Sequence, residues 1–380
     1  MPLTPGDPAP WFTARSTVNP RFVFDTIAGR YVVLCFFGSA GQPAGRRVLD
    51  DVEENRTRFD NLNATFLGVS VDPDDERLAR LPTGWPGIIH FWDHDLTISR
   101  LYGAAVEAGS PAAYRPCTIV LDQALRVLAV VPFGDDPEAH VPRLCAMLDA
   151  LPPVRSLAGH APALVVPRVF EPEFCRTLVG LYEQHGGEDS GFMRDVDGRT
   201  VPILDYSHKR RRDYDITDQE VVKSAQARLV RRLVPEIRKA FQFEATRIER
   251  HIVACYDSAE QAHFRAHRDN TTKGTAHRRF AVTINLNAEQ YEGGDLWFPE
   301  FGPRTYRAPT GGAVVFSCSL LHEATPVVRG RRYAFLPFLY DEQAAKIRQA
   351  NVRYLGQATS PPGAADVAGA PESEDQAKGL

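Results

Sequence analysis

The sequence has no long apolar run, no closely paired cysteines and no strong excess of charge, and each absence excludes a class of protein. None of its apolar stretches reaches the roughly 18 to 20 residues that span a bilayer. The first residues, from Met1 to Asp7, lack the basic and apolar regions of a signal peptide. A net charge of -4, from 44 basic and 48 acidic residues, argues against nucleic acid or a membrane surface as the partner. We therefore expect a cytoplasmic protein that binds a small molecule or another protein.

The six cysteines stand singly, without a Cys-x-x-Cys pair. This spacing predicts neither a structural zinc site nor a disulfide framework. Most of them are expected to be small buried apolar side chains. They are Cys35, Cys117, Cys145, Cys175, Cys255 and Cys318.

Short apolar segments alternate with helical patterns in the first 151 residues, which is typical of an α/β layer fold. Pro152 and Pro153 then interrupt the last helical pattern, so we place a domain boundary near residue 155. The expected strands are 31–37, 65–71, 88–92, 117–121 and 126–131, and the expected helices are 44–59, 97–102 and 137–151.

The second half shows helical periodicity first and short strands afterwards, which predicts a sheet sandwich buttressed by helices. From about Ala344 the patterning is lost, and residues 360–380, rich in Pro, Ala, Gly and Glu, are expected to be disordered. The expected domains are thus 1–155 and 156–343, followed by a tail at 344–380. The expected helices are 171–185 and 218–241, and the expected strands are 247–256, 279–286, 294–298, 312–317 and 332–339.

Three side chains in the second half have the spacing of a metal site. His267 and Asp269 lie two residues apart, so on an extended segment both point to the same face. His322 follows 53 residues after Asp269, just beyond an apolar strand. Two imidazoles and one carboxylate leave three coordination positions open, which suits a non-haem Fe(II) centre. Arg332, ten residues after His322, is placed to form a bidentate pair with the distal carboxylate of a metal-chelated acid.

This combination of His-x-Asp, a distal His and an Arg ten residues later resembles the Fe(II)/2-oxoglutarate dioxygenases, specifically their prolyl-4-hydroxylase-like branch. Further matches are Tyr256, eleven residues before His267, and the segments 285–287, 291–296 and 322–332. The resemblance covers roughly residues 160 to 342. It implies a double-stranded β-helix, or jelly roll, for this half of the chain.

The resemblance also implies a role for each matching residue. His267, Asp269 and His322 would hold Fe(II), Arg332 would bind the C5 carboxylate of 2-oxoglutarate, and Tyr256 would hydrogen-bond to it. The implied reaction uses dioxygen to hydroxylate an unactivated C–H bond while 2-oxoglutarate is decarboxylated to succinate and CO2. Ascorbate is a further candidate cofactor.

One residue departs from the family pattern. Relatives often carry an aromatic residue where this chain has Asn285. The smaller polar side chain of Asn285 would either reshape the cosubstrate pocket or leave Arg332 alone to orient 2-oxoglutarate.

The polar segment 270–279 directly follows Asp269 and contains a glycine. We expect a mobile lid in which Arg278 or Arg279 faces the substrate, with an ordinary solvent loop as the alternative. Three further histidines lie outside the spacing of the motif and are expected to be surface or packing residues: His251, His263 and His277.

The first 150 residues resemble the peroxiredoxins within the thioredoxin-like fold, through the segments 6–12, 31–37, 67–72, 101–103 and 115–122. In that family the peroxidatic cysteine opens the helix after the first long strand. Here the corresponding residues 38–46 read Gly-Ser-Ala-Gly-Gln-Pro-Ala-Gly-Arg, without a cysteine.

Other thiols are poor substitutes for the missing one. Cys35 lies within the strand, and Cys117, next to a proline that resembles the cis-proline of the fold, is the one thiol in a redox position. We expect the domain to have lost peroxidase chemistry and to act as a scaffold, a homodimerisation surface or a substrate-presenting module.

Two other classes of function stay open at this point: a thiol peroxidase or redox sensor with an accessory oxygenase half, and a non-catalytic binding protein. The missing nucleophile argues against the first and the intact metal motif against the second. The motifs do not choose among a prolyl residue in a protein, a free amino acid and another metabolite as the substrate.

Overall fold

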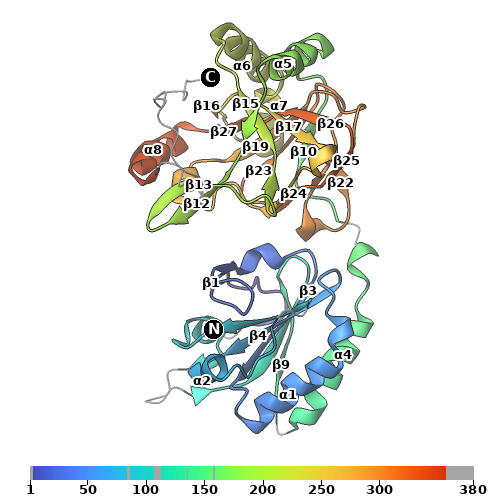
Figure 1. Ribbon diagram of the computed structural model, residues 1–380, viewed down its shortest axis with the longest axis vertical. Helices are drawn as coiled ribbons and strands as arrows, with labels where there is room; N and C mark the ends of the chain where they lie inside the picture. Colours follow the sequence, from blue (N-terminus) through green and yellow to red (C-terminus); the bar gives the residue numbers. More distant parts are fainter. Residues whose placement is uncertain (1–2, 84–85, 107–112, 135, 157–158, 357–380) are drawn as a thin grey trace. The chain divides into compact units, whose positions relative to one another are not determined.

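The computed structural model describes residues 3–83, 86–106, 113–134, 136–156 and 159–356 (Figure 1). The chain separates into two compact units. The first comprises Met1–Ala161 together with Phe298–Arg304, and the second comprises Pro162–Trp297 together with Thr305–Leu380. Among the described residues, no helix combines the length and the apolar character needed to cross a membrane.

The first unit is built on a five-stranded sheet with the order β5-β4-β3-β8-β9. All eight residues of its central strand β3 are buried, as expected for a strand covered on both faces. The helices α1 and α4 lie along this sheet (Figure 1), and Val33, Cys35 and Phe37 of the strand pack in one cluster with their residues. The elements are β3 (Tyr31–Gly38), β4 (Ala64–Ser70), β5 (Ile88–Trp92), β8 (Cys117–Leu121), β9 (Val127–Pro132), α1 (Pro43–Glu54), α2 (Pro73–Arg77), α3 (Thr97–Leu101) and α4 (His140–Ala150).

The second unit contains a nine-stranded and a five-stranded sheet. The path of the larger sheet is β10-β23-β19-β26-β17-β15-β11, with β16 and β27 attached, and that of the smaller is β14-β18-β24-β21-β22. The larger sheet holds β10 (Leu164–Val166), β11 (Glu188–Asp189), β15 (Arg212–Asp215), β16 (Arg247–Glu249), β17 (Ile252–Asp257), β19 (Phe280–Asn285), β23 (Ala313–Ser317), β26 (Arg331–Phe335) and β27 (Phe338–Tyr340). The smaller holds β14 (Lys209–Arg210), β18 (His263–His267), β21 (Leu296–Trp297), β22 (Thr305–Tyr306) and β24 (His322–Ala324).

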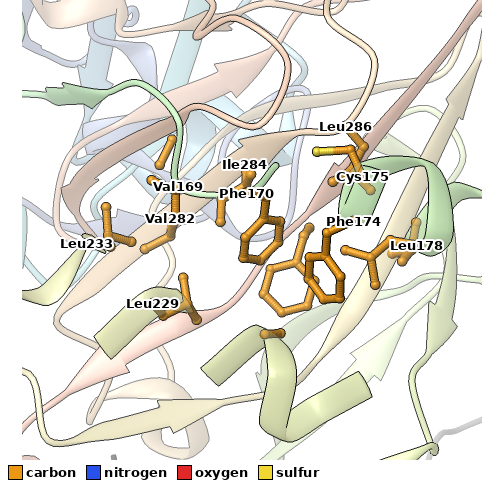
Figure 2. Close-up of a cluster of buried hydrophobic side chains, with 14 of the residues drawn as sticks. Val169, Phe170, Phe174, Cys175, Leu178, Leu229, Leu233, Val282, Ile284 and Leu286 are labelled. Atoms are coloured by element: carbon orange, nitrogen blue, oxygen red, sulfur yellow. The ribbon is translucent and has the colours of Figure 1, made fainter. Parts of the chain in front are cut away.

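Alternation along β17 shows how these layers are joined. Val253 and Cys255 belong to a core with the helices α5 (Pro172–His185), α6 (Gln219–Arg232) and α7 (Val234–Phe241). Ala254 and Tyr256 belong to a second cluster with residues of β18 and β24. Because neighbouring side chains of a strand point to opposite faces, the larger sheet has helices on one face and the smaller sheet on the other. Figure 2 shows part of the helix-side core, including Phe170, Phe174 and Leu229.

The predicted helix at 218–241 is two helices in the structure. It breaks at Leu233, between α6 and α7, where Pro235 lacks the backbone N–H that a continuous helix needs. The apolar stripe is nevertheless correct, since Val222, Ala225 and Leu229 are all buried.

The prediction that patterning ends near Ala344 is wrong for helix α8 (Glu342–Asn351). Asp341 caps this helix by accepting a hydrogen bond from the backbone N–H of Ala344, at 2.7 Å. Ala344 is the one fully buried residue of the helix, so the sequence offers no apolar stripe to detect. The expectation of disorder for 360–380 lies outside the described residues.

A hairpin also escaped the sequence interpretation. Strands β12 (Phe192–Val196) and β13 (Arg199–Ile203) are joined by Asp197 and Gly198, both with positive φ, at 48° and 80°. An Asp-Gly pair between two strand-like segments is the usual sequence signal of such a turn, so this element was predictable.

Candidate metal centre

Two of the three predicted metal ligands lie on paired strands, and the third, Asp269, lies in the turn that follows β18. His267 ends β18 and stands directly opposite His322, the first residue of β24, in the antiparallel register. Nε2 of His267 lies 3.6 Å from Oδ1 of Asp269, and Nε2 of His322 lies 3.4 Å from Oδ2 of the same carboxylate. One ligand atom from each residue falls within 4.8 Å of the others, a cluster that can hold a single metal ion.

Backbone carbonyls orient both imidazoles. Nδ1 of His267 is 2.7 Å from the carbonyl oxygen of Arg265, and Nδ1 of His322 is 3.0 Å from that of Leu320. Because a carbonyl oxygen can only accept, each Nδ1 carries the proton and each Nε2 presents the lone pair that binds a metal.

The electrostatics of the cluster suit a divalent cation. Burial lowers the pKa of His267 to about 4, so its imidazole is neutral at pH 7. Burial alone would raise the pKa of Asp269, but the imidazoles of His322 and His267 outweigh that effect and the pKa is lowered. The site therefore offers a neutral imidazole from His267 and an ionised carboxylate from Asp269, which are the protonation states that metal binding requires.

Arg332, in the same unit as this cluster, carries a positive charge with unmade hydrogen bonds. Its side chain lies on β26 and is among the largest fully buried side chains of the described chain. Nε and Nη1 have no hydrogen-bond partner among the described residues. A buried guanidinium with unmade hydrogen bonds is costly, so the arrangement fits a bound anion. Tyr256 stands opposite Arg332 in the register of β17 and β26, with the guanidinium 4.9 Å from the ring centre.

Tyr291 is a further member of this group. Its hydroxyl is buried and without a partner in the described structure. Burial raises the pKa of Tyr291 and the nearby Arg332 guanidinium opposes that rise. Gly294, at φ +66°, makes room for the arginine, because a Cβ there would lie 3.1 Å from its Cδ. The sequence places Tyr291 in the segment 291–296, which resembles the family, but does not predict a role for it.

Comparison with known families agrees with this geometry. A model of the 2OG-Fe(II) oxygenase superfamily matches residues 251–340, and a model of the AhpC/TSA family matches residues 5–130. The chain joins a peroxiredoxin-like domain to a 2OG-Fe(II) oxygenase domain.

Individual relatives match over shorter stretches. PKHD-type hydroxylase NE2125 of Nitrosomonas europaea is 30% identical over 112 residues, which cover 27% of this chain and 49% of that protein. A PKHD-type hydroxylase of Shewanella frigidimarina is 42% identical over 61 residues, covering 16% and 27%. The chain thus spans about half or less of the length of these curated relatives.

Among solved structures, a prolyl-4-hydroxylase of Pseudomonas putida is similar over 48% of this chain and 94% of its own, at 16% identity and a TM-score of 0.37. The peroxidoxin BcpB of Mycobacterium tuberculosis is similar over 40% of this chain and 99% of its own, at 19% identity and a TM-score of 0.35.

In the oxygenase domain, the segment expected to be a mobile lid is held by hydrogen bonds. The backbone N–H of Lys273 donates to Asp195, at 3.2 Å, and that of Gly274 donates to Thr200, at 2.8 Å. Asn351 donates to the carbonyl of Lys273, at 2.8 Å. These contacts attach the segment to the β12–β13 hairpin and to α8, so its polar composition reflects internal hydrogen bonding.

The two arginines of this segment contact other residues of the domain. The guanidinium of Arg278 pairs with the buried carboxylate of Glu249, with Nη2 and Oε1 2.5 Å apart, and lies 4.0 Å from the ring centre of Phe338. Arg279 donates to the carbonyl of Ala276, at 2.9 Å. The charge of Arg278 is thus already matched by Glu249, and its Nη1 also lies 3.5 Å from the carbonyl oxygen of Asp269, so a substrate-facing role for Arg278 stays a prediction. The structure gives no contact that assigns substrate binding to Arg279.

Histidines outside the motif have packing partners, as expected. His277 is buried and hydrogen-bonds to Glu249 at 2.7 Å, and His251 is buried 3.3 Å from the amide nitrogen of Gln226. His263 contacts the carbonyls of Gln261 and Ser207.

Asn285, the departure from the family pattern, is buried at the end of β19. Its Nδ2 donates to the carbonyl of Ala308, at 2.7 Å, while Oδ1 has no partner among the described residues. The amide is thus held from one side and keeps one acceptor for a further hydrogen bond.

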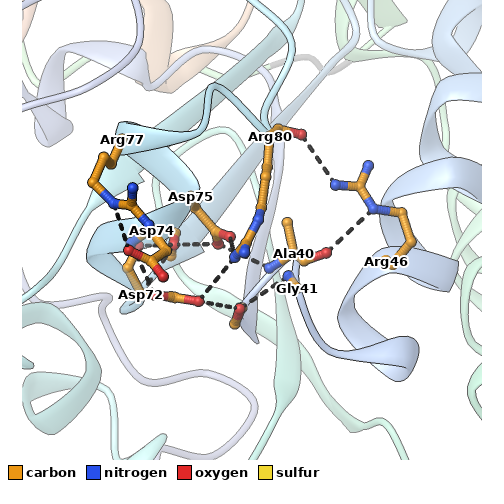
Figure 3. A network of polar contacts seen from close by, with 10 residues as sticks. Ala40, Gly41, Arg46, Asp72, Asp74, Asp75, Arg77 and Arg80 are labelled. Carbon is orange, nitrogen blue, oxygen red and sulfur yellow. Dashed lines mark hydrogen bonds and ion pairs between the residues drawn. The ribbon is translucent and has the colours of Figure 1, made fainter.

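The peroxiredoxin-like domain replaces the reactive turn by a network of charges (Figure 3). Oγ of Ser39 donates to Asp72, at 2.6 Å, and the backbone N–H of Ala40 donates to Asp75, at 2.8 Å. Arg80 pairs with both carboxylates, at 3.2 and 3.1 Å. The turn between β3 and α1 is therefore fixed by hydrogen bonds at the place where the family has its nucleophile.

Neither thiol near this turn is activated. Burial raises the pKa of Cys35 to about 12 and that of Cys117 to about 11. Since the thiolate is the reactive form, both groups are poor nucleophiles at pH 7.

We expect the protein to lack thiol peroxidase activity. With a thiol reductant and hydrogen peroxide, peroxide consumption should match that of Cys35→Ser and Cys117→Ser variants, since the wild-type thiols are protonated. Peroxide loss is followed over time with purified protein. A fast consumption that disappears in Cys117→Ser would contradict this expectation.

Proposed function

We propose that the protein is an Fe(II)- and 2-oxoglutarate-dependent dioxygenase that hydroxylates an unactivated C–H bond, in the manner of prolyl 4-hydroxylases, and converts 2-oxoglutarate and dioxygen to succinate and CO2. The observation that carries the proposal is a three-ligand cluster in the same domain as a buried arginine with two unsatisfied N–H groups. A metal-chelating dicarboxylate needs both, one for each end of the molecule.

His267, Asp269 and His322 would hold the iron, and Arg332 would pair with the C5 carboxylate of the cosubstrate. Bound Fe(II) supplies the redox chemistry that lets dioxygen attack a C–H bond. The neutral imidazoles and the single carboxylate keep a net positive charge on the loaded site, which favours an anionic cosubstrate.

Tyr256 is set up to donate a hydrogen bond to that carboxylate. Its hydroxyl oxygen accepts from Nη1 of Arg211, at 3.4 Å. The hydroxyl proton therefore remains for another acceptor. The hydroxyl of Tyr291 has no partner among the described residues. It would donate a second hydrogen bond to the same carboxylate.

Aromatic rings shield the metal ligands from water. Phe264 stacks on the imidazole of His267 with ring centres 3.5 Å apart, and Phe316 meets His322 edge-on at 4.6 Å. Water-poor surroundings strengthen the electrostatic interactions of the site and protect reactive species from side reactions.

The pair of packed sheets supports assignment of the oxygenase domain to the double-stranded β-helix, or jelly roll. The peroxiredoxin-like domain would serve as a scaffold, a dimerisation surface or a substrate-presenting module. Ascorbate remains a candidate reductant that keeps iron in the Fe(II) state.

Replacing Arg332 by Met should raise the KM for 2-oxoglutarate about 100-fold. Loss of charge-assisted hydrogen bonds costs about 3 kcal/mol, and about 1.4 kcal/mol corresponds to a factor of ten. KM is obtained from succinate formation at varied 2-oxoglutarate. The matched control is Arg331→Met, since Arg331 is exposed and pairs with Asp257. Equal KM values for the two variants would remove Arg332 from the cosubstrate site.

The function itself is tested by succinate formation from 2-oxoglutarate with added Fe(II), in wild type, His267→Ala and the control His263→Ala. We expect succinate with the wild type and the control, and none above background with His267→Ala. Peptide and amino-acid panels, screened by mass spectrometry for a gain of one oxygen atom, identify the primary substrate. Wild-type protein that forms no succinate with any member of the panels would refute the proposal.

A further inference from the structure

A second group of buried charges lies beside the candidate metal centre. It consists of Lys209, Arg211, Asp213 and Ser190, on or next to β14, β15 and β11. Lys209 and Arg211 are 5% and 6% exposed, respectively. The role proposed for the metal centre uses none of these residues directly except through the hydrogen bond from Arg211 to Tyr256.

Two aromatic rings connect this group to the site. The ammonium of Lys209 is 4.9 Å from the centre of the Phe264 ring, the same ring that stacks on His267. The guanidinium of Arg211 is 5.8 Å from the centre of the Tyr256 ring, which Arg332 also approaches. The Phe264 ring therefore lies between Lys209 and the metal ligand His267. The Tyr256 ring likewise contacts both Arg211 and Arg332.

The amine of Lys209 has no carboxylate among its hydrogen-bond partners in the described structure. Lys209 hydrogen-bonds to neutral atoms, the Oγ of Ser190 at 2.7 Å and the carbonyl of Gly191 at 2.5 Å. Asp213 is the one carboxylate in contact with the group, and its Oδ2 already accepts from Arg211 and from Ser190, both at 2.5 Å. Burial lowers the pKa of Lys209 most, Arg211 and the partly buried Arg250 lower it further, and Asp213 and Asp269 oppose the change without cancelling it.

Burial without a hydrogen-bonded carboxylate disfavours the ammonium form of Lys209, and a bound carboxylate would restore it. Nε of Arg211 and Oδ1 of Asp213 are moreover buried without hydrogen-bond partners in the part of the chain that the structure describes. The group thus combines two buried basic side chains with an unused donor and an unused acceptor.

We propose that Lys209 and Arg211 form a second anion site that binds a carboxylate of the primary substrate. The substrate class is then a small carboxylic acid, such as a free amino acid, in preference to an internal residue of a peptide. An amine or hydroxyl next to that carboxylate would satisfy Asp213. This inference rests on the proposed oxygenase function, because it places the substrate next to the metal centre.

The test uses full-length protein loaded with Mn(II), which replaces Fe(II) without turnover, in the presence of 2-oxoglutarate. The probes are propionate and N-acetylproline, each compared with its neutral amide. Binding is measured from the paramagnetic relaxation of the probe protons. We expect each acid to bind at least 10-fold more tightly than its amide.

Lys209→Met should abolish this preference while leaving the KM for 2-oxoglutarate within two-fold of wild type. Lys209→Gln serves as a second variant if the first is unstable, and Lys223→Met, on the exposed face of α6, is the matched control. Thermal unfolding verifies that each variant is folded.

Wild-type protein that binds acids and amides equally would overturn the proposal. So would an acid preference that persists in both Lys209 variants, which would show that the carboxylate binds the metal. A rise in KM for 2-oxoglutarate in Lys209→Met would assign these cations to the cosubstrate instead. Failure of the oxygenase function would appear separately, as absence of succinate in the Fe(II) assay.

Discussion

Replacing Asp269 by Ala is expected to abolish turnover of 2-oxoglutarate, with a loss of at least about 1,000-fold. Asp269 is the one anionic ligand of the cluster, and both of its oxygens face an imidazole nitrogen, at 3.6 and 3.4 Å. Substituting residues that merely support metal ligands typically costs about 10- to 100-fold in affinity or activity, so loss of a ligand should cost more. Succinate formation measures the loss of activity, and Mn(II) titration measures the loss of metal affinity.

Asp257→Ala is the control for this experiment, because Asp257 forms a surface ion pair with Arg331. It should retain activity within about two-fold, as surface pairs contribute little. If Asp269→Ala bound metal and formed succinate as well as Asp257→Ala, the assignment of the metal centre would be wrong.

Replacing Glu249 by Leu should destabilise the oxygenase domain by about 3 to 5 kcal/mol, the usual cost of removing one partner from a buried ion pair. Glu249 accepts from Arg278, at 2.5 Å, and from His277, at 2.7 Å, and no more than 14% of any of the three side chains is exposed. Loss of the carboxylate leaves the Arg278 guanidinium buried without a counter-charge. The free energy of unfolding is measured in urea.

The same pair should make stability depend on pH. Burial alone would raise the pKa of Glu249, but Arg278 and His277 hold it well below the usual value of 4.5. The stabilisation is therefore complete above about pH 4.5 and is lost as the pH falls toward the lower pKa of the folded state. In Glu249→Leu this part of the pH dependence should vanish.

Glu342→Gln is the matched control for Glu249→Leu, because Glu342 is more than half exposed and pairs with Arg247 on the surface. Its cost should stay below about 1 kcal/mol. Equal destabilisation by the two substitutions would show that the buried pair has no special role.

The metal ligands were predictable because their spacing along the chain matches that of a known family. The two-residue spacing of His267 and Asp269 predicted that they lie together, and Arg332 follows His322 by the family's spacing. In the structure β18 ends at His267, so Asp269 reaches the same site from the turn after the strand. That His267 stands opposite His322 is a property of strand register, which depends on contacts between distant segments.

The remaining parts of the site depend on such long-range contacts. The polar segment after Asp269 looks like a lid in the sequence, but its arginine pairs with Glu249, 29 residues earlier in the chain. Charge and polarity alone do not reveal whether a side chain meets solvent or a buried partner. For the same reason the group around Lys209 reads as an ordinary basic stretch until the structure shows it buried.

The fold shows the same division. Strands with strong apolar patterns, such as β3 and β23, lie within two residues of their predicted positions, because burial dictates their composition. The sequence does not predict helix α8, because a helix with one fully buried residue shows no apolar periodicity. It does not predict the break at Leu233 either, because the apolar stripe of residues 218–241 continues across the break.

The most direct test of the proposed function is the incorporation of labelled oxygen from ¹⁸O₂ by the purified protein with Fe(II) and 2-oxoglutarate. One atom of ¹⁸O should enter succinate for each molecule of CO2 released, and the labelling should be absent in His267→Ala. Succinate that forms without ¹⁸O, or labelling that persists in His267→Ala, would contradict an oxygenase reaction at this metal centre.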